Sequence, residues 1–306
     1  MSDEVVPVDD TSMYANVFSY LGLPLSRDLD DSSIDAIVMG VPYDLGTSGR
    51  AGTRSGPNGI RQASANLRWE ERRWPWDFKL ADRLSAVDYG DIQFLWGDSE
   101  DMLAKVEAHA ERISGVGKTL VSFGGDHFVT LPLLRGHAKT HGTLSLIHFD
   151  AHTDTYDEDE KYNHGCMFFR APKEGLIDPG HSIQIGIRTE YDRPNHLFEV
   201  IDAQRANEQS VADTVAVIRR RVGDHPAYLT FDIDCLDPAY APGTGTPVVG
   251  GMTTSKVLGI LQGIADLNIV GFDVVEVSPA YDNAHITALA GATLALQFLY
   301  MRASRG

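Results

Sequence analysis

The chain has 306 residues, of which 43% are hydrophobic and 23% charged, and this composition can supply a substantial buried core. Its 43 acidic and 26 basic side chains give a formal net charge of -17, which repels nucleic-acid backbones and anionic lipid. The acidic N-terminus argues against a signal peptide, no apolar run reaches membrane-spanning length, and two cysteines make no disulfide framework. We therefore expect a cytoplasmic globular protein with neither nucleic acid nor membrane as a partner.

Short apolar runs rich in β-branched residues alternate along the chain with longer segments of helical period. The runs predicted as strands are, in chain order, 35–41, 84–89, 119–123, 143–149, 182–187, 227–233 and 269–277. The segments predicted as helices, with apolar residues three and four positions apart, are 57–73, 100–114, 129–140, 211–222, 255–267 and 286–301.

This alternation predicts an α/β fold in which helices cover both faces of a parallel sheet. Ligand sites in such sheets lie just beyond the carboxyl ends of the strands. No repeat or linker divides the chain, so we expect a single domain over residues 16–306. The acidic first residues predict a flexible segment over residues 1–15.

A pair of glycines follows the third predicted strand and precedes a histidine. Gly124 and Gly125 would supply the conformational freedom of a sharp strand-to-helix turn, which would present His127 at the rim of the sheet. By itself this motif is a weak signal, because a purely structural turn accounts for it equally well.

The fourth predicted strand runs into three chemically active side chains, Asp150, His152 and Asp154. In extended backbone these alternate residues project to one side. Two carboxylates and an imidazole that converge at a buried strand end would be costly without a cation. The alternative is a solvated acidic turn, but the preceding apolar run 144–149 is typical of a buried strand.

Asp232 and Asp234 repeat the same spacing at the end of another apolar run. Cys235 would point to the opposite face of an extended segment and is interpreted as a small buried residue. Asp237 precedes a proline and fits a turn or helix cap better than a ligand.

The candidate ligands are four carboxylates and two imidazoles without a thiolate, a set that suits Mn²⁺ or a similar ion better than structural zinc. They are His127, Asp150, His152, Asp154, Asp232 and Asp234. Six ligands are too many for one open site. Two ions roughly 3.5–4 Å apart that share carboxylates would use all six and hold a bridging hydroxide as nucleophile.

Several motifs resemble those of a known family. They are Gly124-Gly125-Asp126-His127, 149–154, 231–234 continuing through 241–247, and 273–277, with further similarity at 40–44, 49–57 and around 69–76. Over nearly the whole chain, the sequence resembles the ureohydrolase (arginase/agmatinase) family, and bacterial agmatinases above all. The resemblance implies a three-layer α/β/α sandwich around an eight-stranded parallel sheet, two Mn²⁺ ions per subunit, and a homotrimer or homohexamer.

The family pattern also implies how the ligands divide between the two ions. One ion would be held by His127, Asp150, Asp154 and Asp232, and the other by Asp150, His152, Asp232 and Asp234, with Asp150 and Asp232 bridging. Asp154 would additionally relay a proton to the departing amine.

Two further residues match the family's catalytic positions. His164 would shuttle protons, and Glu276 would bind the guanidinium by paired hydrogen bonds. The alternatives are a loop histidine without a role and a carboxylate in a structural salt bridge. Asp126 and Asp273 are expected to be supporting residues, and His148 is expected to face away from the ligands, as a supporting or core residue.

Four consecutive acids, at 157–160, lie between Asp154 and His164. Agmatine brings no carboxylate toward such a loop, whereas arginine or 4-guanidinobutyrate does, so the charge favours agmatine. A solvated loop without substrate contact is the alternative. We therefore expect hydrolysis of agmatine to putrescine and urea.

The other activities within the family are that of a guanidinobutyrase, which makes urea and 4-aminobutyrate, and then those of formiminoglutamase and arginase. From other classes, we consider a catalytically silent metal-binding homologue and a two-metal phosphoesterase. The intact ligand set with His164 and Glu276 argues against the first. A phosphoesterase would need basic residues near the ligands to hold phosphate, and this chain has no evident basic clamp there.

Overall fold

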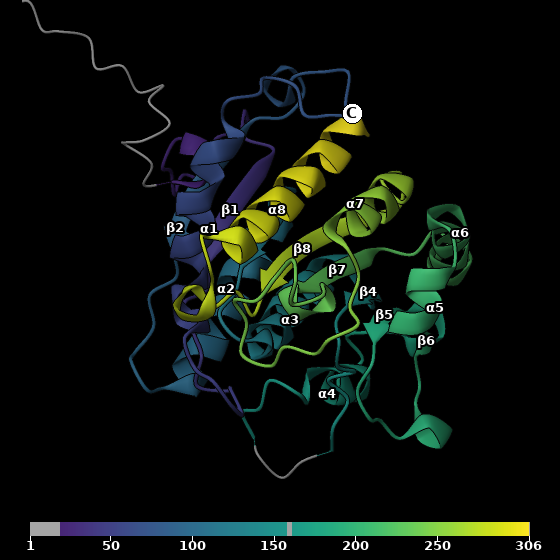
Figure 1. Ribbon diagram of the computed structural model, residues 1–306. Helices are drawn as coiled ribbons and strands as arrows, with labels where there is room; N and C mark the ends of the chain where they lie inside the picture. The colour runs from purple at the N-terminus through teal and green to yellow at the C-terminus, as the bar shows by residue number, and fades with distance from the viewer. Residues whose placement is uncertain (1–18, 158–160, 306) are drawn as a thin grey trace, which may run out of the picture.

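The computed structural model describes residues 19–157 and 161–305, and the segment predicted to be flexible, 1–15, lies outside them. Eight parallel strands form one sheet in the order β2-β1-β3-β8-β7-β4-β5-β6 (Figure 1). The strands are β1 (Ala36–Gly40), β2 (Ala86–Asp91), β3 (Thr119–Phe123), β4 (Ser145–Phe149), β5 (Ile183–Ile187), β6 (Glu199–Asp202), β7 (Ala227–Asp232) and β8 (Ile269–Val275). The α/β fold with an eight-stranded parallel sheet is therefore confirmed. The expected single domain over 16–306 stays a prediction.

Two layers of helices cover the sheet, each over its own hydrophobic cluster. One face carries α1 (Gly56–Ser64), α5 (Ala203–Glu208), α6 (Val211–Val222), α7 (Thr254–Gly263) and α8 (Ile286–Ser304), and the other carries α2 (Ser99–Gly115), α3 (Thr130–His141) and α4 (Met167–Lys173). Strands β1, β3, β4, β5 and β7 are buried along their whole length, which explains why they read as continuous apolar runs.

The yellow helix α8 crosses the front of the sheet in Figure 1. By length and composition alone it could span a membrane, with a mean hydropathy of 1.2, although no run of that kind was expected. However, 72% of this apolar window is buried inside the protein. α8 packs on the sheet, and apolar residues cover nearly its whole circumference. This is the pattern of a buried core helix.

The predicted elements differ from the observed ones where the pattern is short or misleading. β6, α4 and α5 were not predicted, since four to seven residues carry too little periodicity. The helix predicted over 57–73 ends at Ser64 and continues only as a 3₁₀ turn, Ala65–Leu67. Beyond that turn the chain is mostly exposed, so no apolar face remains to bury.

The glycine pair after β3 brings two strand ends into close contact. The Gly125 N–H donates to the Val41 carbonyl at 2.9 Å, and the Asp126 N–H donates to the Tyr43 carbonyl at 2.8 Å. A Cβ on Gly125 would lie 1.6 Å from the Tyr43 oxygen, while neither glycine of the pair has a positive φ. The prediction that they serve conformational freedom was therefore wrong; Gly125 is needed for space.

Replacing Gly125 with Ala should lower the free energy of unfolding by about 1–3 kcal/mol or more, because the methyl group forces two backbones apart. Gly49→Ala is the matched control, since its added Cβ meets nothing within 4 Å, and it should change stability by less than about 0.5 kcal/mol. Denaturant titration measures both. Equal stabilities would contradict the assigned close approach.

Candidate active site

Four neighbouring strands in the middle of the sheet deliver the candidate residues to one edge. His127 follows β3, Glu276 follows β8, Asp232 ends β7 and Asp150 follows β4, and these strands are adjacent in the order β3-β8-β7-β4. Because all four are parallel, their carboxyl ends meet at the same edge. This is the location that the sequence predicted for the chemistry.

Turns rather than extended backbone make the acidic side chains converge. β4 ends at Phe149, so Asp150 and Asp154 lie beyond the strand, and Asp154 has a φ of 51°. After Asp232 the chain enters a 3₁₀ turn in which the Asp234 N–H donates to Asp232 Oδ1 at 2.8 Å. The expectation that alternation along a strand would align these residues was wrong, although the side chains do come together.

Three carboxylates surround one imidazole nitrogen. Nδ1 of His127 lies 3.1 Å from Asp150 Oδ2, 2.8 Å from Asp154 Oδ2 and 3.4 Å from Asp232 Oδ2. Despite these short distances, the geometry gives this buried nitrogen no hydrogen-bond partner among the described residues. Such a nitrogen, facing only the oxygens of carboxyl groups, fits a metal ligand better than a hydrogen-bonded core histidine.

The contacts of the other His127 nitrogen, Nε2, show that the lone pair of the neutral ring lies on Nδ1. Nε2 lies 2.9 Å from the Thr230 hydroxyl, which itself lies 2.5 Å from Asp273 Oδ1. The Asp273 carboxylate accepts the hydroxyl proton, so the hydroxyl accepts from the His127 Nε2–H. A neutral His127 therefore presents the lone pair of Nδ1 to the carboxylates, and Asp273 supports it as expected.

A second cluster adjoins the first through Asp150. Nδ1 of His152 lies 3.3 Å from Asp150 Oδ1 and 3.1 Å from Asp234 Oδ2. Asp150 thus directs one oxygen to each imidazole. The donor atoms of Asp150, His152 and Asp234 lie within 4.8 Å of one another, so they form a second group that could hold a metal ion.

The charges of these groups are poorly balanced without a cation. Burial alone would lower the pKa of both imidazoles, yet the neighbouring carboxylates raise the pKa of His127 well above its usual value and that of His152 to about 12. Burial, together with the charges of Asp234 and Asp150, raises the pKa of Asp232 well above its usual value. The groups therefore retain protons, which bound metal ions would displace.

We expected His148 to face away from the ligands, but the structure places it beside them. Its donor atoms group within 4.8 Å of those of His127, Asp150 and Asp154. However, Nε2 is 2.8 Å from Asp150 Oδ2, and Nδ1 is 2.9 Å from Gln184 Nε2. Because both ring nitrogens are engaged in this way, His148 supports Asp150 rather than offering a free ligand atom. Asp232, which that group does not include, lies 3.4 Å from His127 Nδ1 through Oδ2.

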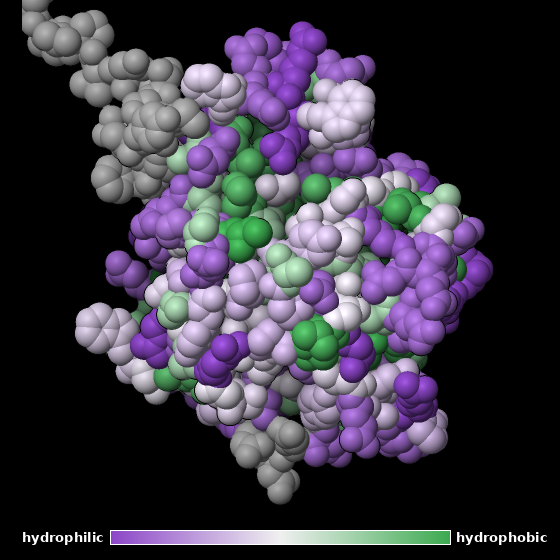
Figure 2. Space-filling view, viewed as in Figure 1, coloured by the Kyte–Doolittle hydropathy of each residue, from purple (hydrophilic) through white to green (hydrophobic). Residues whose placement is uncertain are grey.

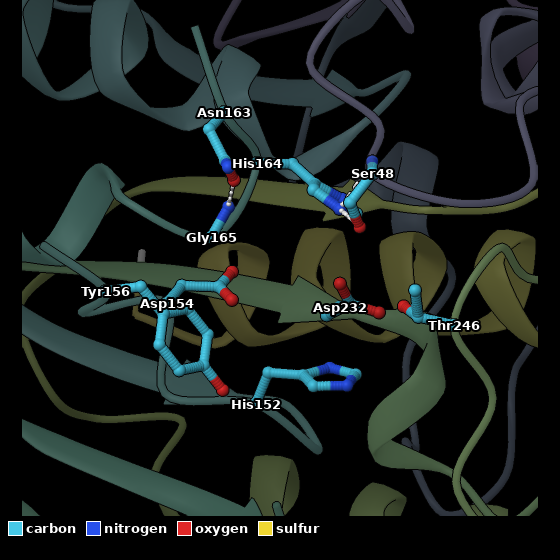
Figure 3. A pocket seen from close by; sticks show the side chains of 9 residues that line it. All are labelled: Ser48, His152, Asp154, Tyr156, Asn163, His164, Gly165, Asp232 and Thr246. Carbon is cyan, nitrogen blue, oxygen red and sulfur yellow. Dashed lines mark hydrogen bonds between the residues drawn. The ribbon is translucent and has the colours of Figure 1, made fainter. Parts of the chain in front are cut away.

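A cavity of about 150 Å³ opens beside these clusters (Figure 3). Its lining residues are Ser48, His152, Asp154, Tyr156, Asn163, His164, Gly165, Asp232 and Thr246. Figure 3 shows His164 and Ser48 across the cavity from His152, with Asp154 and Asp232 between them. Of the described residues that line it, none is a lysine or arginine, so the walls suit a cation.

His164 pairs with Glu276 behind the cavity wall. Its Nδ1 lies 2.7 Å from Glu276 Oε1, which also accepts from the His127 N–H at 2.9 Å. Burial would lower the pKa of His164, but the Glu276 charge and hydrogen bond, with Asp154 and Asp126, raise that pKa to about 9. The second Glu276 oxygen, Oε2, is buried and has no hydrogen-bond partner within the described part of the chain.

Ser48 was not identified from the sequence, because it contacts His164 across 116 residues. Its backbone N–H donates to His164 Nε2 at 3.1 Å, and its hydroxyl lies 2.8 Å from the same nitrogen. Thr246, also missed, donates to Asp234 Oδ2 at 3.2 Å. Thr246 falls within the family-like run 241–247, which was the available signal, whereas Ser48 lies between two such runs.

The remaining described residues named in the sequence analysis either hold loops and turns or lie outside this cavity. Asp126 accepts from the Gly46 and Phe128 N–H groups and so ties the loop before Ser48 to the site. Asp237 accepts three backbone N–H bonds, as a turn residue should. Asp157 lines a neighbouring cavity rather than this one, and the other three acids, 158–160, lie outside the described residues.

The chain is similar to known proteins over nearly its whole length. The model of the arginase family matches residues 34–301. An agmatinase of Photorhabdus laumondii is 58% identical, over 97% of this chain and 96% of its own. A crystal structure described as a hypothetical agmatinase from Burkholderia thailandensis shares 45% identity with a TM-score of 0.92, covering 96% of this chain and 93% of its own.

A proclavaminate amidino hydrolase from Streptomyces clavuligerus is 37% identical with a TM-score of 0.90, covering 96% of this chain and all of its own. The family model and the curated relative each cover most of the sequence, and the range that the family model matches includes every candidate site residue. The chain therefore belongs to the arginase family.

Proposed function

We propose that this protein hydrolyses agmatine to putrescine and urea at a pair of Mn²⁺ ions. The observation that carries the proposal is the 58% identity, over nearly the full length of both chains, to a protein named agmatinase. The site supports it, because a carboxylate-rich cradle, a proton carrier and a cavity without basic side chains among its described lining residues occur together.

The metal ions would be held by the two adjoining clusters. We assign one ion to His127, Asp150, Asp154 and Asp232, and the other to Asp150, His152, Asp232 and Asp234. Six ligands with four carboxylates and no thiolate favour Mn²⁺ over structural zinc. When bound, such a pair would lower the pKa of a water molecule and so supply a nucleophile near neutral pH.

His164 can hold or release a proton without moving away from its partners. In the neutral state, Nδ1–H donates to Glu276 and Nε2 accepts from the Ser48 N–H. In the protonated state, Nε2–H can instead donate to the Ser48 hydroxyl at the same position. His164 therefore stands at the cavity wall as the proton carrier to the departing amine, together with Asp154.

Glu276 contributes through both of its oxygens. Oε1 holds His164 and the His127 backbone, which leaves Oε2, without a hydrogen-bond partner among the described residues, as the oxygen that would accept a guanidinium N–H. Glu276 has a φ of 63°, as Asp154 has a φ of 51°, and strained backbone at two carboxylates of one site is typical of functional positions.

The proposal includes assembly of identical chains into a trimer or hexamer. A groove between α7 and α8 is lined mainly by apolar side chains, among them Leu258, Leu289 and Leu294. Figure 2 shows apolar side chains reaching the surface over this part of the molecule. Exposed apolar surface of this kind is a common feature of protein contacts.

Turnover should be selective for agmatine. The described residues that line the cavity include no lysine or arginine to pair with the carboxylate of arginine or 4-guanidinobutyrate, so we expect kcat/KM for agmatine to be at least about tenfold higher, equivalent to ~1.4 kcal/mol. A urea-release assay with Mn²⁺-loaded protein measures this ratio. Comparable rates on 4-guanidinobutyrate would favour a guanidinobutyrase, and no urea from any guanidino compound would favour a catalytically silent homologue.

Removal of metal should abolish urea release while leaving the fold intact, since the ligands stay hydrogen-bonded within the sheet edge. Dialysis against a chelator, followed by circular dichroism and assay, tests this. Mn²⁺ at about 100 times its Kd should restore activity and stabilise the protein by about 2.7 kcal/mol. Full activity of verified metal-free protein would contradict the metal assignment.

The pH profile should report the His164–Glu276 pair. Because the pKa of His164 is raised to about 9, its proton is available below that pH, and kcat should fall as the pH rises above it. Glu276→Gln removes a charge that raises this pKa, so the descending limb should move to lower pH. A limb that stays in place in the variant would show that another group titrates there.

A further inference from the structure

A buried chain of hydrogen bonds leads away from Asp150 toward the surface. His148 on β4 contacts Asp150 Oδ2 through Nε2 at 2.8 Å and Gln184 Nε2 through Nδ1 at 2.9 Å. Gln184 on β5 also donates to the Thr153 carbonyl at 2.7 Å, and its Oε1 lies 2.7 Å from His196 Nε2. His148 and Gln184 are fully buried.

The Thr153 carbonyl fixes the direction of every bond in this chain. A carbonyl oxygen can only accept, so the Gln184 amide must turn its nitrogen toward Thr153 and therefore also toward His148. Nδ1 of His148 is then an acceptor, and a neutral His148 carries its proton on Nε2. That proton is donated to Asp150 Oδ2.

Every side-chain polar atom of Gln184 has a hydrogen-bond partner, and the His148 ring is held by packing. Both amide protons and the oxygen of Gln184 are used, so nothing in its polar group is left unpaired. The His148 ring packs against Phe168, with ring centroids 4.5 Å apart, which limits its rotation. Burying a glutamine between apolar strands costs free energy, and these hydrogen bonds offset that cost.

We propose that Gln184 is a positioning residue for the metal centre. By setting the tautomer of His148, it makes that ring a donor to Asp150 and fixes the carboxylate that faces both imidazole clusters. Gln184 contacts no cluster side chain other than His148; it acts through His148 and through the Thr153 carbonyl, which lies between His152 and Asp154. The inference rests on the metal centre of the proposed function.

The test is Gln184→Met, which keeps the side chain's length and removes its hydrogen bonds. Mn²⁺ affinity of the metal-free protein, measured by calorimetry, should fall about 10–100-fold. Gln297→Met is the matched control, because Gln297 is also buried but lies on α8 and bonds to Trp76. Its Mn²⁺ affinity should equal that of the wild type.

Two further measurements separate positioning from general loss of structure. Nitrogen-15 spectra of the metal-free wild type should show His148 protonated on Nε2, and this preference should be lost in Gln184→Met. In a His148→Phe background, Gln184→Met should cost less affinity than it does in the wild type, because only the bond to the Thr153 carbonyl is then left to lose. Protonation of His148 on Nδ1 in the wild type, or additive losses in the double variant, would overturn the proposal.

The two proposals fail in different ways. If the wild type binds no Mn²⁺, the metal centre itself is wrong. If the wild type binds Mn²⁺ and Gln184→Met binds it equally well, only the role of Gln184 is overturned.

Discussion

The crowding of buried carboxylates around two imidazoles is the constraint on which the rest of the site depends. Asp150, Asp154 and Asp232 all approach one nitrogen of His127 within 3.4 Å. In a low-dielectric interior, such like charges repel strongly, and protons or cations must compensate them. The apolar strands beneath cannot do so, because they are buried on both faces.

Two imidazoles of this site are oriented from behind by the sheet. The Thr230 and Asp273 side chains turn the lone pair of His127 toward the carboxylates. Gln184 turns the protonated nitrogen of His148 toward Asp150. Histidine therefore presents a lone pair to the carboxylates in one position and a proton in the other, according to the polar partner that the neighbouring strand supplies.

Much of this organisation could be predicted from the sequence. Acids and histidines directly after apolar runs identified the edge of the sheet, because parallel strands bring their carboxyl ends together. The local geometry could not be predicted in the same way. Period-two alternation placed Asp232 and Asp234 on one strand face, whereas a 3₁₀ turn brings them together. His148 lies two residues before Asp150, so the same alternation places both on one side, and the expectation that His148 faces away was wrong because it departed from that rule.

Contacts between distant segments escaped prediction altogether. Ser48 and His164 are 116 residues apart, and no spacing connects them. Gln184 reads as one polar residue in an apolar strand until β5 is placed beside β4. Short elements such as β6 carry too few residues for a periodic signal. Sequence patterns therefore indicate which residues reach the site edge, while tertiary pairing decides what each of them contacts.

The central claim is that these charges are balanced by two metal ions sharing Asp150 and Asp232. Anomalous diffraction at the manganese edge, from crystals grown with Mn²⁺, tests it most directly. The account predicts two peaks, one beside His127 and one beside His152, with Asp150 and Asp232 contacting both. A single peak, or density that leaves the His127 Nδ1 without a metal neighbour, would contradict it.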